Sequence, residues 1–186
     1  MAFATSAVRE AKNSAKVLAR VADKTGVDLQ VLSGTDEARL TFLAVRRWYG
    51  WSAGQLLVLD IGGGSLEVAM GRDEEPVLAE SLPLGAGRTT RTRFRHDPPT
   101  RSELVATSAW LDDQLTDLAR KVTKWGEPDR VVATSKTFRS LARLTGAAPS
   151  AAGPRVRRTL SDTALRQLLA SLSLGWAAVD RDARPP

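Results

Sequence analysis

The sequence predicts a protein that mixes α-helices with β-strands, and two observations support this class. Short apolar runs typical of buried strands alternate along the chain with longer segments whose apolar residues recur every three or four positions. In the middle of the chain, two apolar runs follow each other directly and are separated by three glycines, as in a β-hairpin. Together they predict an α/β fold with a hairpin near the centre of the chain.

The beginning of the chain predicts two strand–helix units. Residues 3–6 have the composition of a strand end, and the helix that follows is expected to stop at Gly26, because glycine readily adopts the left-handed conformation that ends helices. Residues 27–32 predict a second short strand. Ser33 then provides an N-cap for a second helix, and Glu37 falls in its first turn, where an acid complements the helix dipole. The apolar face expected for this helix consists of Leu40, Leu43, Ala44 and Trp48.

A glycine-rich hairpin forms the centre of the sequence. Residues 56–59 and 66–70 predict two paired strands, since apolar residues dominate both. Glycines in the connection allow positive φ and bring backbone N–H groups close to an anion without obstruction by Cβ atoms, and a serine adds a hydroxyl donor. The candidate phosphate-binding residues are therefore Gly62, Gly63, Gly64 and Ser65.

Two carboxylates flank this connection, Asp60 before it and Glu67 after it. They would repel a bound phosphate unless a cation lay between them, and Mg²⁺ prefers one or two carboxylates together with water and phosphate oxygens. Asp60 and Glu67 are thus candidate Mg²⁺ ligands. For the hairpin taken alone, the alternative is a flexible turn between two strands.

The remainder of the chain predicts further strands and helices. Gly85 and Gly87 open an arginine-rich segment and provide a second, less specific anion contact where a helix begins. The expected elements are a strand at 77–84, a helix at 101–124, a strand at 130–134, and helices at 135–144 and 160–172. A linker is expected at 146–154, and residues 173–186 are expected to form a disordered tail.

A short internal echo suggests how the chain divides. Ala4-Thr5-Ser6 with Arg9 recurs as Ala133-Thr134-Ser135 with Arg139. Interpreted as a repeat, residues 1–26 are the last strand and helix of one domain copy, and residues 27–172 form a second copy that ends with the same unit. The front of the first copy is then missing.

Composition excludes several kinds of site and location. Without cysteine and with one histidine, His96, the chain has neither disulfides nor thiolate or multi-histidine metal sites, so any metal must be held by oxygen. The absence of a signal segment and of a membrane-length apolar run predicts a cytoplasmic protein with no membrane partner. The net charge of +6 favours an anionic partner. The sequence leaves the oligomeric state open, a homodimer included.

Four motifs in order resemble the exopolyphosphatase and guanosine pentaphosphate phosphohydrolase family (Ppx/GppA). They are Ala4-Thr5-Ser6-Ala7-Val8-Arg9-Glu10-Ala11 with Asn13, Val31-Leu32-Ser33-Gly34-Thr35-Asp36-Glu37-Ala38-Arg39-Leu40, Leu57-Val58-Leu59-Asp60-Ile61-Gly62-Gly63-Gly64-Ser65 with Glu67, and Leu82-Pro83-Leu84-Gly85-Ala86-Gly87-Arg88. The resemblance covers the chain from about residue 3 to about residue 169.

This resemblance implies a ribonuclease-H-like α/β domain of the actin, Hsp70 and sugar-kinase superfamily, with a mixed sheet and helices on both faces. It implies that Glu37 is the catalytic base, that Asp60 and Glu67 help to hold Mg²⁺, and that the glycines bind phosphate, with Arg88 as a further phosphate-binding residue. Cleavage of a phosphoanhydride by water needs such a base, a cation and N–H donors on the phosphate. The implied substrate is inorganic polyphosphate, with guanosine pentaphosphate as a second candidate.

Two departures from the family pattern concern the ends of the chain. The family begins with a domain that carries its own phosphate hairpin, and it continues through further helices after the last helix expected here. Both ends of this chain therefore look truncated, and we expect the chain alone to have little or no phosphatase activity.

Three other functions compete with hydrolysis. The first is a non-catalytic polyphosphate- or nucleotide-binding module. The second is an ATP-dependent kinase or ATPase of the same superfamily, which is disfavoured because residues 132–136 lack the double glycine that such relatives place beside adenosine. The third is nucleic-acid binding, which is disfavoured because few aromatic residues are interleaved with the arginines.

Overall fold

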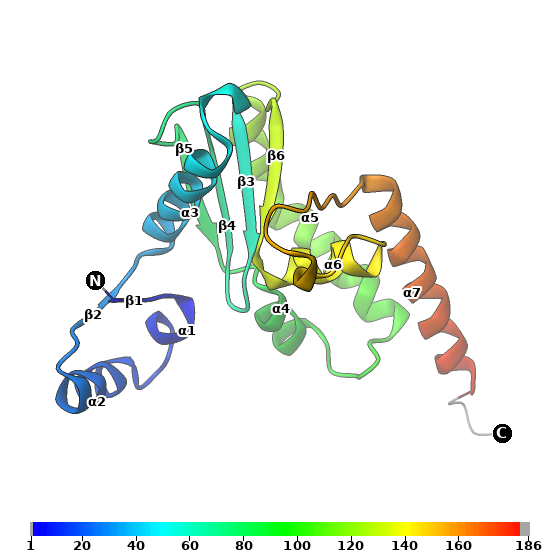
Figure 1. Ribbon diagram of the computed structural model, residues 1–186. Helices are drawn as coiled ribbons and strands as arrows, with labels where there is room; N and C mark the ends of the chain where they lie inside the picture. The colour runs from blue at the N-terminus through cyan, green and yellow to red at the C-terminus, as the bar shows by residue number, and fades with distance from the viewer. Residues whose placement is uncertain (1, 183–186) are drawn as a thin grey trace.

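The computed structural model describes residues 2–182, with side chains described through residue 172 (Figure 1). The strands are β1 (Ala2–Ala4), β2 (Leu29–Val31), β3 (Leu56–Ile61), β4 (Leu66–Gly71), β5 (Leu78–Leu82) and β6 (Arg130–Thr134). The helices are α1 (Ser6–Arg9), α2 (Ser14–Thr25), α3 (Gly34–Tyr49), α4 (Ala86–Arg93), α5 (Arg101–Thr123), α6 (Ser135–Leu144) and α7 (Asp162–Asp182), with short 3₁₀ turns η1 (Trp51–Ala53) and η2 (Ser150–Ala152). The boundaries of β3 to β6, α5 and α6 agree with the sequence prediction to within two residues.

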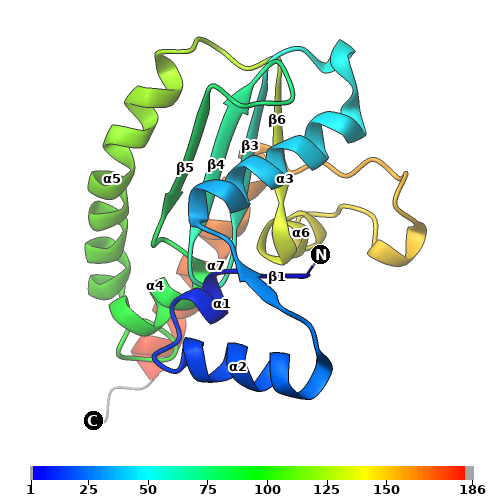
Figure 2. The ribbon, with the colours of Figure 1, turned by 90° about the vertical axis from the view of Figure 1, so that its left-hand side faces the viewer.

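The larger sheet has the strand order β5-β4-β3-β6. Strand β4 runs antiparallel to both β3 and β5, whereas β6 runs parallel to β3. Helix α3 covers one face of this sheet and α5 covers the other (Figure 2). The predicted mixed sheet with helices on both faces is therefore confirmed.

One hydrophobic core lies between α3 and the sheet. Its buried members are Ala38, Phe42, Val45, Ala53, Leu56, Val58 and Ala69. The predicted apolar face of this helix is wrong, because Trp48 is 65% exposed and Leu40 is 45% exposed. These two residues instead line a cavity of about 540 Å³ beside β6.

A buried arginine explains why the sequence pattern selected the wrong face of α3. Arg46 interrupts the stripe that is buried, yet it is only 1% exposed. Its guanidinium donates hydrogen bonds to the carbonyls of Gly50, Gly54 and Gly71 at 3.2, 2.6 and 3.1 Å. A buried charge that is hydrogen-bonded in this way can occupy a core position that a hydropathy pattern assigns to the surface.

A second core lies between α5 and the opposite face of the sheet. Its buried members are Leu66, Val68, Met70, Leu78, Leu84 and Leu118, and Leu57, Leu59 and Ile61 pack against them. Because successive side chains of a strand point to opposite faces, the alternation that sends these residues toward α5 sends Asp60 and Glu67 to the α3 face. Both candidate metal ligands thus share one face of the sheet.

The N-terminal residues form a second, two-stranded sheet in which β1 pairs parallel with β2. This pairing groups β2 with the N-terminal helices, whereas the sequence places a domain boundary after residue 26. The helix expected between the strands is divided into α1 and α2, because the amides of Ala11 and Ser14 bond to carbonyls only three residues back. Gly26 ends α2 with φ of 68°, as predicted.

This N-terminal unit lies at the end of the larger sheet where the loop between β3 and β4 emerges (Figure 1). A Cβ atom placed on Gly64 would lie 3.3 Å from the carboxylate of Glu10 and 3.4 Å from the hydroxyl of Ser6. The loop predicted to bind phosphate therefore faces a second structural unit.

The C-terminal helix is longer than the sequence predicts. Helix α7 continues through Asp182, so the disorder expected for residues 173–186 is wrong over 173–182. One glycine inside a helix costs only about 1 kcal/mol relative to alanine, so Gly175 does not end α7. Residues 183–186 lie outside the described part of the chain.

The two copies of the internal echo mark equivalent strand-to-helix junctions. Thr5, between β1 and α1, has φ of −119° and ψ of −155°, and Thr134, between β6 and α6, has φ of −105° and ψ of −171°. The following serines differ, because Ser135 has a positive φ of 81°. The short sequence repeat therefore corresponds to a similar backbone conformation at Thr5 and Thr134.

None of the helices within residues 2–182 is long and apolar enough to cross a membrane.

Candidate phosphate-binding site

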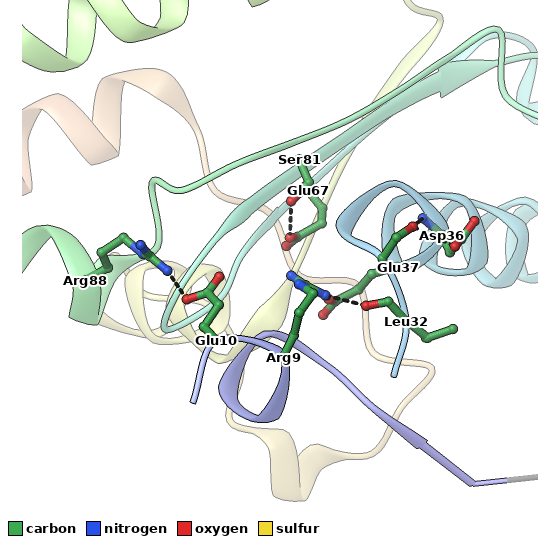
Figure 3. A network of polar contacts seen from close by, with 9 residues as sticks. Arg9, Glu10, Leu32, Asp36, Glu37, Glu67, Ser81 and Arg88 are labelled. Atoms are coloured by element: carbon green, nitrogen blue, oxygen red, sulfur yellow. Dashed lines mark hydrogen bonds and ion pairs between the residues drawn. The ribbon is translucent and has the colours of Figure 1, made fainter. Parts of the chain in front are cut away.

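The two candidate metal ligands lie directly opposite each other. Asp60, near the end of β3, is the register partner of Glu67 in the antiparallel strand β4. The hydroxyl of Thr134 donates a 2.6 Å hydrogen bond to Asp60 Oδ2. The hydroxyl of Ser81 donates a 2.9 Å hydrogen bond to Glu67 Oε1 (Figure 3). Each carboxylate is therefore oriented by a hydroxyl from a neighbouring strand or strand end.

Glu67 is the more deeply buried of the two acids. It is 4% exposed, and burial raises the pKa of its carboxyl above the usual value. Hydrogen bonds from the hydroxyls of Ser65 and Ser81 lower this pKa in part, while the negative charges of Glu37 and Asp60 raise it further. Glu37 and Asp60 thus lie close enough to Glu67 for their charges to act on its carboxyl.

The donor chemistry of the Asp60–Glu67 pair fits a hard divalent cation. Within the described side chains, no three or more acidic, histidine or cysteine residues form a group that could hold a metal ion. The candidate set is therefore the carboxylate pair, and Mg²⁺ commonly uses one or two carboxylates and takes its other ligands from water and phosphate. The hydroxyls of Thr134 and Ser81 donate to these carboxylates, and hydrogen bonds of this kind orient metal-binding carboxylates.

The glycine loop, defined as Gly62–Gly64 with Ser65, does not use the backbone conformation expected from its sequence. None of its three glycines is among the residues with positive φ. A Cβ atom on Gly63 would have no atom within 4 Å, so neither the packing nor a positive φ requires glycine there. Glycine at this position leaves open space above the backbone, which suits the close approach of a ligand.

Gly85 is required for a different reason. A Cβ atom there would lie 2.4 Å from the backbone of Gly64 and of Ser65. Only glycine lets the N-terminus of α4 pack this closely on the loop. The second anion contact predicted at this helix start is wrong in part, because the amides of Ala86 and Arg88 donate to the carbonyls of Gly62 and Gly63 at 2.9 and 2.8 Å. These N–H groups brace the loop instead.

Arg88, the predicted phosphate-binding arginine, also braces the loop. Its Nε donates to the Gly64 carbonyl at 2.8 Å, and its Nη2 forms an ion pair with Glu10 (Figure 3). Its guanidinium therefore already has a backbone partner and an anionic partner.

Glu37, the predicted base, lies in the first turn of α3 on the side facing the N-terminal unit. Arg9 Nη1 approaches Glu37 Oε2 at 3.4 Å and donates to the Leu32 carbonyl at 2.6 Å (Figure 3). The Ser33 cap is confirmed, with its hydroxyl accepting from the Asp36 amide at 3.1 Å. The Glu37 side chain is 22% exposed, so water can reach its carboxylate.

The sequence did not assign roles to several residues that complete this arrangement. Arg9 and Glu10 come from the N-terminal unit and contact Glu37 and Arg88, and Ser81 and Thr134 orient the two carboxylates. Arg9 and Glu10 could have been suspected because they belong to the first of the four family motifs. Nothing in the sequence pattern marks Ser81, whose role depends on strand register.

The arrangement combines features that phosphoryl chemistry uses. An open glycine loop connects the two strands that carry the opposed carboxylates, and water can reach a third carboxylate, that of Glu37. Such a site can bind a cation with a phosphate and can present a base to a water molecule.

Comparison with known proteins identifies the family of the chain. The Ppx/GppA phosphatase family model matches residues 1–178. Exopolyphosphatase 1 of Mycobacterium tuberculosis is 65% identical over 181 residues, which cover 97% of this chain and 52% of that protein. Exopolyphosphatase 1 of Mycobacterium leprae is 65% identical over 173 residues, covering 93% of this chain and 51% of its own length. The chain thus spans about half the length of these relatives.

Solved structures share the fold. The crystal structure of an exopolyphosphatase from Cytophaga hutchinsonii superimposes with a TM-score of 0.77 at 27% identity, covering 94% of this chain and 56% of that one. The Aquifex aeolicus member of the Ppx/GppA family superimposes with a TM-score of 0.60 at 34% identity, covering 76% of this chain and 44% of that one. The predicted superfamily fold is confirmed, and the chain belongs to the Ppx/GppA phosphatase family.

Proposed function

We propose that this protein takes part in hydrolysis of phosphoanhydride bonds and releases terminal phosphate from inorganic polyphosphate, with guanosine pentaphosphate as a second substrate. The observation that supports this most is the open face of Gly63 beside the opposed carboxylates of Asp60 and Glu67. Family membership and the exopolyphosphatases among its relatives support the same substrate class.

Each site residue has a distinct part in this proposal. Asp60 and Glu67 would hold Mg²⁺, which would neutralise charge on the phosphate oxygens. Gly62, Gly63 and Gly64 form the surface against which the phosphate lies. Glu37 orients the attacking water and accepts its proton, a contribution typically worth about 10²- to 10⁴-fold in rate.

The role of Glu37 separates hydrolysis from simple binding. Phosphate release from labelled polyphosphate with Mg²⁺ is measured for the protein and for Glu37→Gln, and tripolyphosphate binding is measured in parallel. Because the chain alone is expected to release little phosphate, release is followed down to the detection limit of the labelled substrate. We expect whatever release the chain shows to fall by about 100-fold or more in Glu37→Gln, while binding stays nearly unchanged. The matched control is Asp36→Asn, which removes the neighbouring acid of the same helical turn and should change release by less than about twofold.

The leading alternative is a non-catalytic polyphosphate- or nucleotide-binding module. Tripolyphosphate binding without any release by the unsubstituted protein would favour this alternative. Equal release by the protein and by Glu37→Gln would show that another group acts as the base.

A further inference from the structure

Arg91 lies on α4 beside the glycine loop, and its guanidinium is available to a ligand. A Cβ atom placed on Gly87 would lie 3.2 Å from Arg91 Nη1 and 3.2 Å from the Gly63 carbonyl oxygen. The Arg91 guanidinium and the Gly63 carbonyl oxygen are thus both immediate neighbours of Gly87. Arg91 is exposed, and among the side chains described through residue 172 its guanidinium forms no hydrogen bond, ion pair or ring contact.

Arg88 and Arg91 differ in what they have left to bind. They are three residues apart on α4, so both reach toward the loop from the same side of the helix. Arg88 already has the Gly64 carbonyl and the Glu10 carboxylate as partners. Arg91 keeps a planar set of donors that can form two parallel hydrogen bonds to a phosphate group.

The Arg91 guanidinium lies close to the loop that a ligand would approach, because it and the Gly63 carbonyl oxygen are both neighbours of Gly87. Gly63 faces a region with no atom within 4 Å of the position that a Cβ atom would occupy, and its carbonyl lies next to Gly87. A phosphate chain resting on Gly63 would bring negative charge to the donors of Arg91. Gly87, on the same helix, lets the Arg91 guanidinium lie this close to the loop, because a larger side chain there would contact both Arg91 and Gly63.

We propose that Arg91 binds a phosphate group of the anion held at the glycine loop, an inference that rests on the proposed function. It assigns to Arg91 the contact that the sequence assigned to Arg88, and it gives Arg88 the structural task of bracing the loop against Glu10. An arginine beyond the first phosphate position favours ligands with several linked phosphates over a single phosphate ion.

The test is calorimetric binding of tripolyphosphate and of inorganic phosphate, both with Mg²⁺, to the whole chain and to Arg91→Gln. We expect the Kd for tripolyphosphate to rise about tenfold in Arg91→Gln, the effect of losing one charge-assisted contact. Arg91→Lys, which keeps the charge without the planar donor pair, should show an intermediate loss. Arg20→Gln, an equal charge change on α2, is the matched control and should leave the Kd unchanged.

Each outcome separates this inference from the proposed function. Tripolyphosphate binding that is equal in the unsubstituted protein and Arg91→Gln overturns the role of Arg91 and leaves the proposed function intact. Equal losses in Arg91→Gln and Arg20→Gln overturn it as well, because they indicate only a general charge effect. No binding of tripolyphosphate by the unsubstituted protein overturns the proposed function together with this inference.

Discussion

Asp60 lies directly across the β3–β4 ladder from Glu67, and both carboxylates are on the face of the sheet that α3 covers. Burial and the neighbouring charges of Glu37 and Asp60 raise the pKa of Glu67. An acidic pair that repels itself in this way is stabilised by a bound cation. Cation binding at this pair should therefore be linked to pH through Glu67.

The first prediction concerns Glu67→Gln. A carboxyl whose pKa is raised in the folded state binds more protons there than when unfolded, so its contribution to stability falls as pH rises above its ordinary pKa of 4.5. In EDTA, Glu67→Gln should therefore gain in Tm relative to the unsubstituted protein as pH rises from 4.5 to about 7. Mg²⁺ should raise the Tm of the unsubstituted protein but not that of the variant. A Tm difference that does not change with pH would contradict this account of Glu67.

The second prediction compares two glycines beside the same loop. Gly63→Ala adds a methyl group in open space, so the free energy of unfolding should change by less than about 0.5 kcal/mol, while tripolyphosphate binding weakens about tenfold. Gly85→Ala places its methyl group 2.4 Å from the loop backbone and should destabilise the fold by about 1–3 kcal/mol. Denaturant unfolding and calorimetry measure both effects. Unimpaired binding by Gly63→Ala would show that no ligand rests on Gly63.

The third prediction uses two adjacent arginines of α3. Arg46→Met removes the guanidinium that donates to the carbonyls of Gly50, Gly54 and Gly71, and it should destabilise the fold by about 3 kcal/mol or more. Arg47→Met removes only an exposed ion pair with Glu74 and should cost about 1 kcal/mol or less. Urea unfolding of both variants gives the comparison. Similar losses in the two variants would mean that the carbonyl contacts of Arg46 contribute little.

The fourth prediction concerns the start of α5. Backbone amides of Arg95 and Thr100 donate to the Glu103 carboxylate and lower its pKa to about 2. A depressed pKa contributes stability above the unfolded value of 4.5, and this contribution is lost as pH falls toward about 2. The stability difference between the unsubstituted protein and Glu103→Gln should shrink over this range. Glu75→Gln, an exposed acid in the turn after β4, is the control; a Glu103→Gln difference that persists at pH 2 would contradict the assignment.

The sequence predicted the sheet strands well because buried strands carry continuous apolar runs with clear glycine boundaries. It placed β6 and α6 at their observed bounds and identified Asp60 and Glu67 as a pair. It failed where a tertiary contact overrides local pattern. Arg46 in a core position hid the buried face of α3. The expected end of the last helix at residue 172 also falls short, because α7 continues through Asp182.

The sequence predicted only part of the candidate site, because the rest depends on tertiary contacts. Local motifs identified the glycine loop and Glu37, but they do not reveal which groups approach from another unit. The contacts of Arg9 with Glu37 and of Glu10 with Arg88 depend on how the N-terminal unit lies against the loop. The glycines also do not adopt the positive φ that their sequence suggests. Instead, Gly63 faces open space and Gly85 permits close packing.

The measurement that tests the central claim most directly is calorimetric titration of tripolyphosphate in Mg²⁺ and in EDTA, for the unsubstituted protein and for Asp60→Asn. Asparagine can still accept the hydrogen bond from Thr134, so the substitution removes mainly the charge. The account predicts binding that depends on Mg²⁺ and weakens by about tenfold or more in Asp60→Asn. Binding of equal strength in EDTA and in Asp60→Asn, or no binding by the unsubstituted protein, would contradict it.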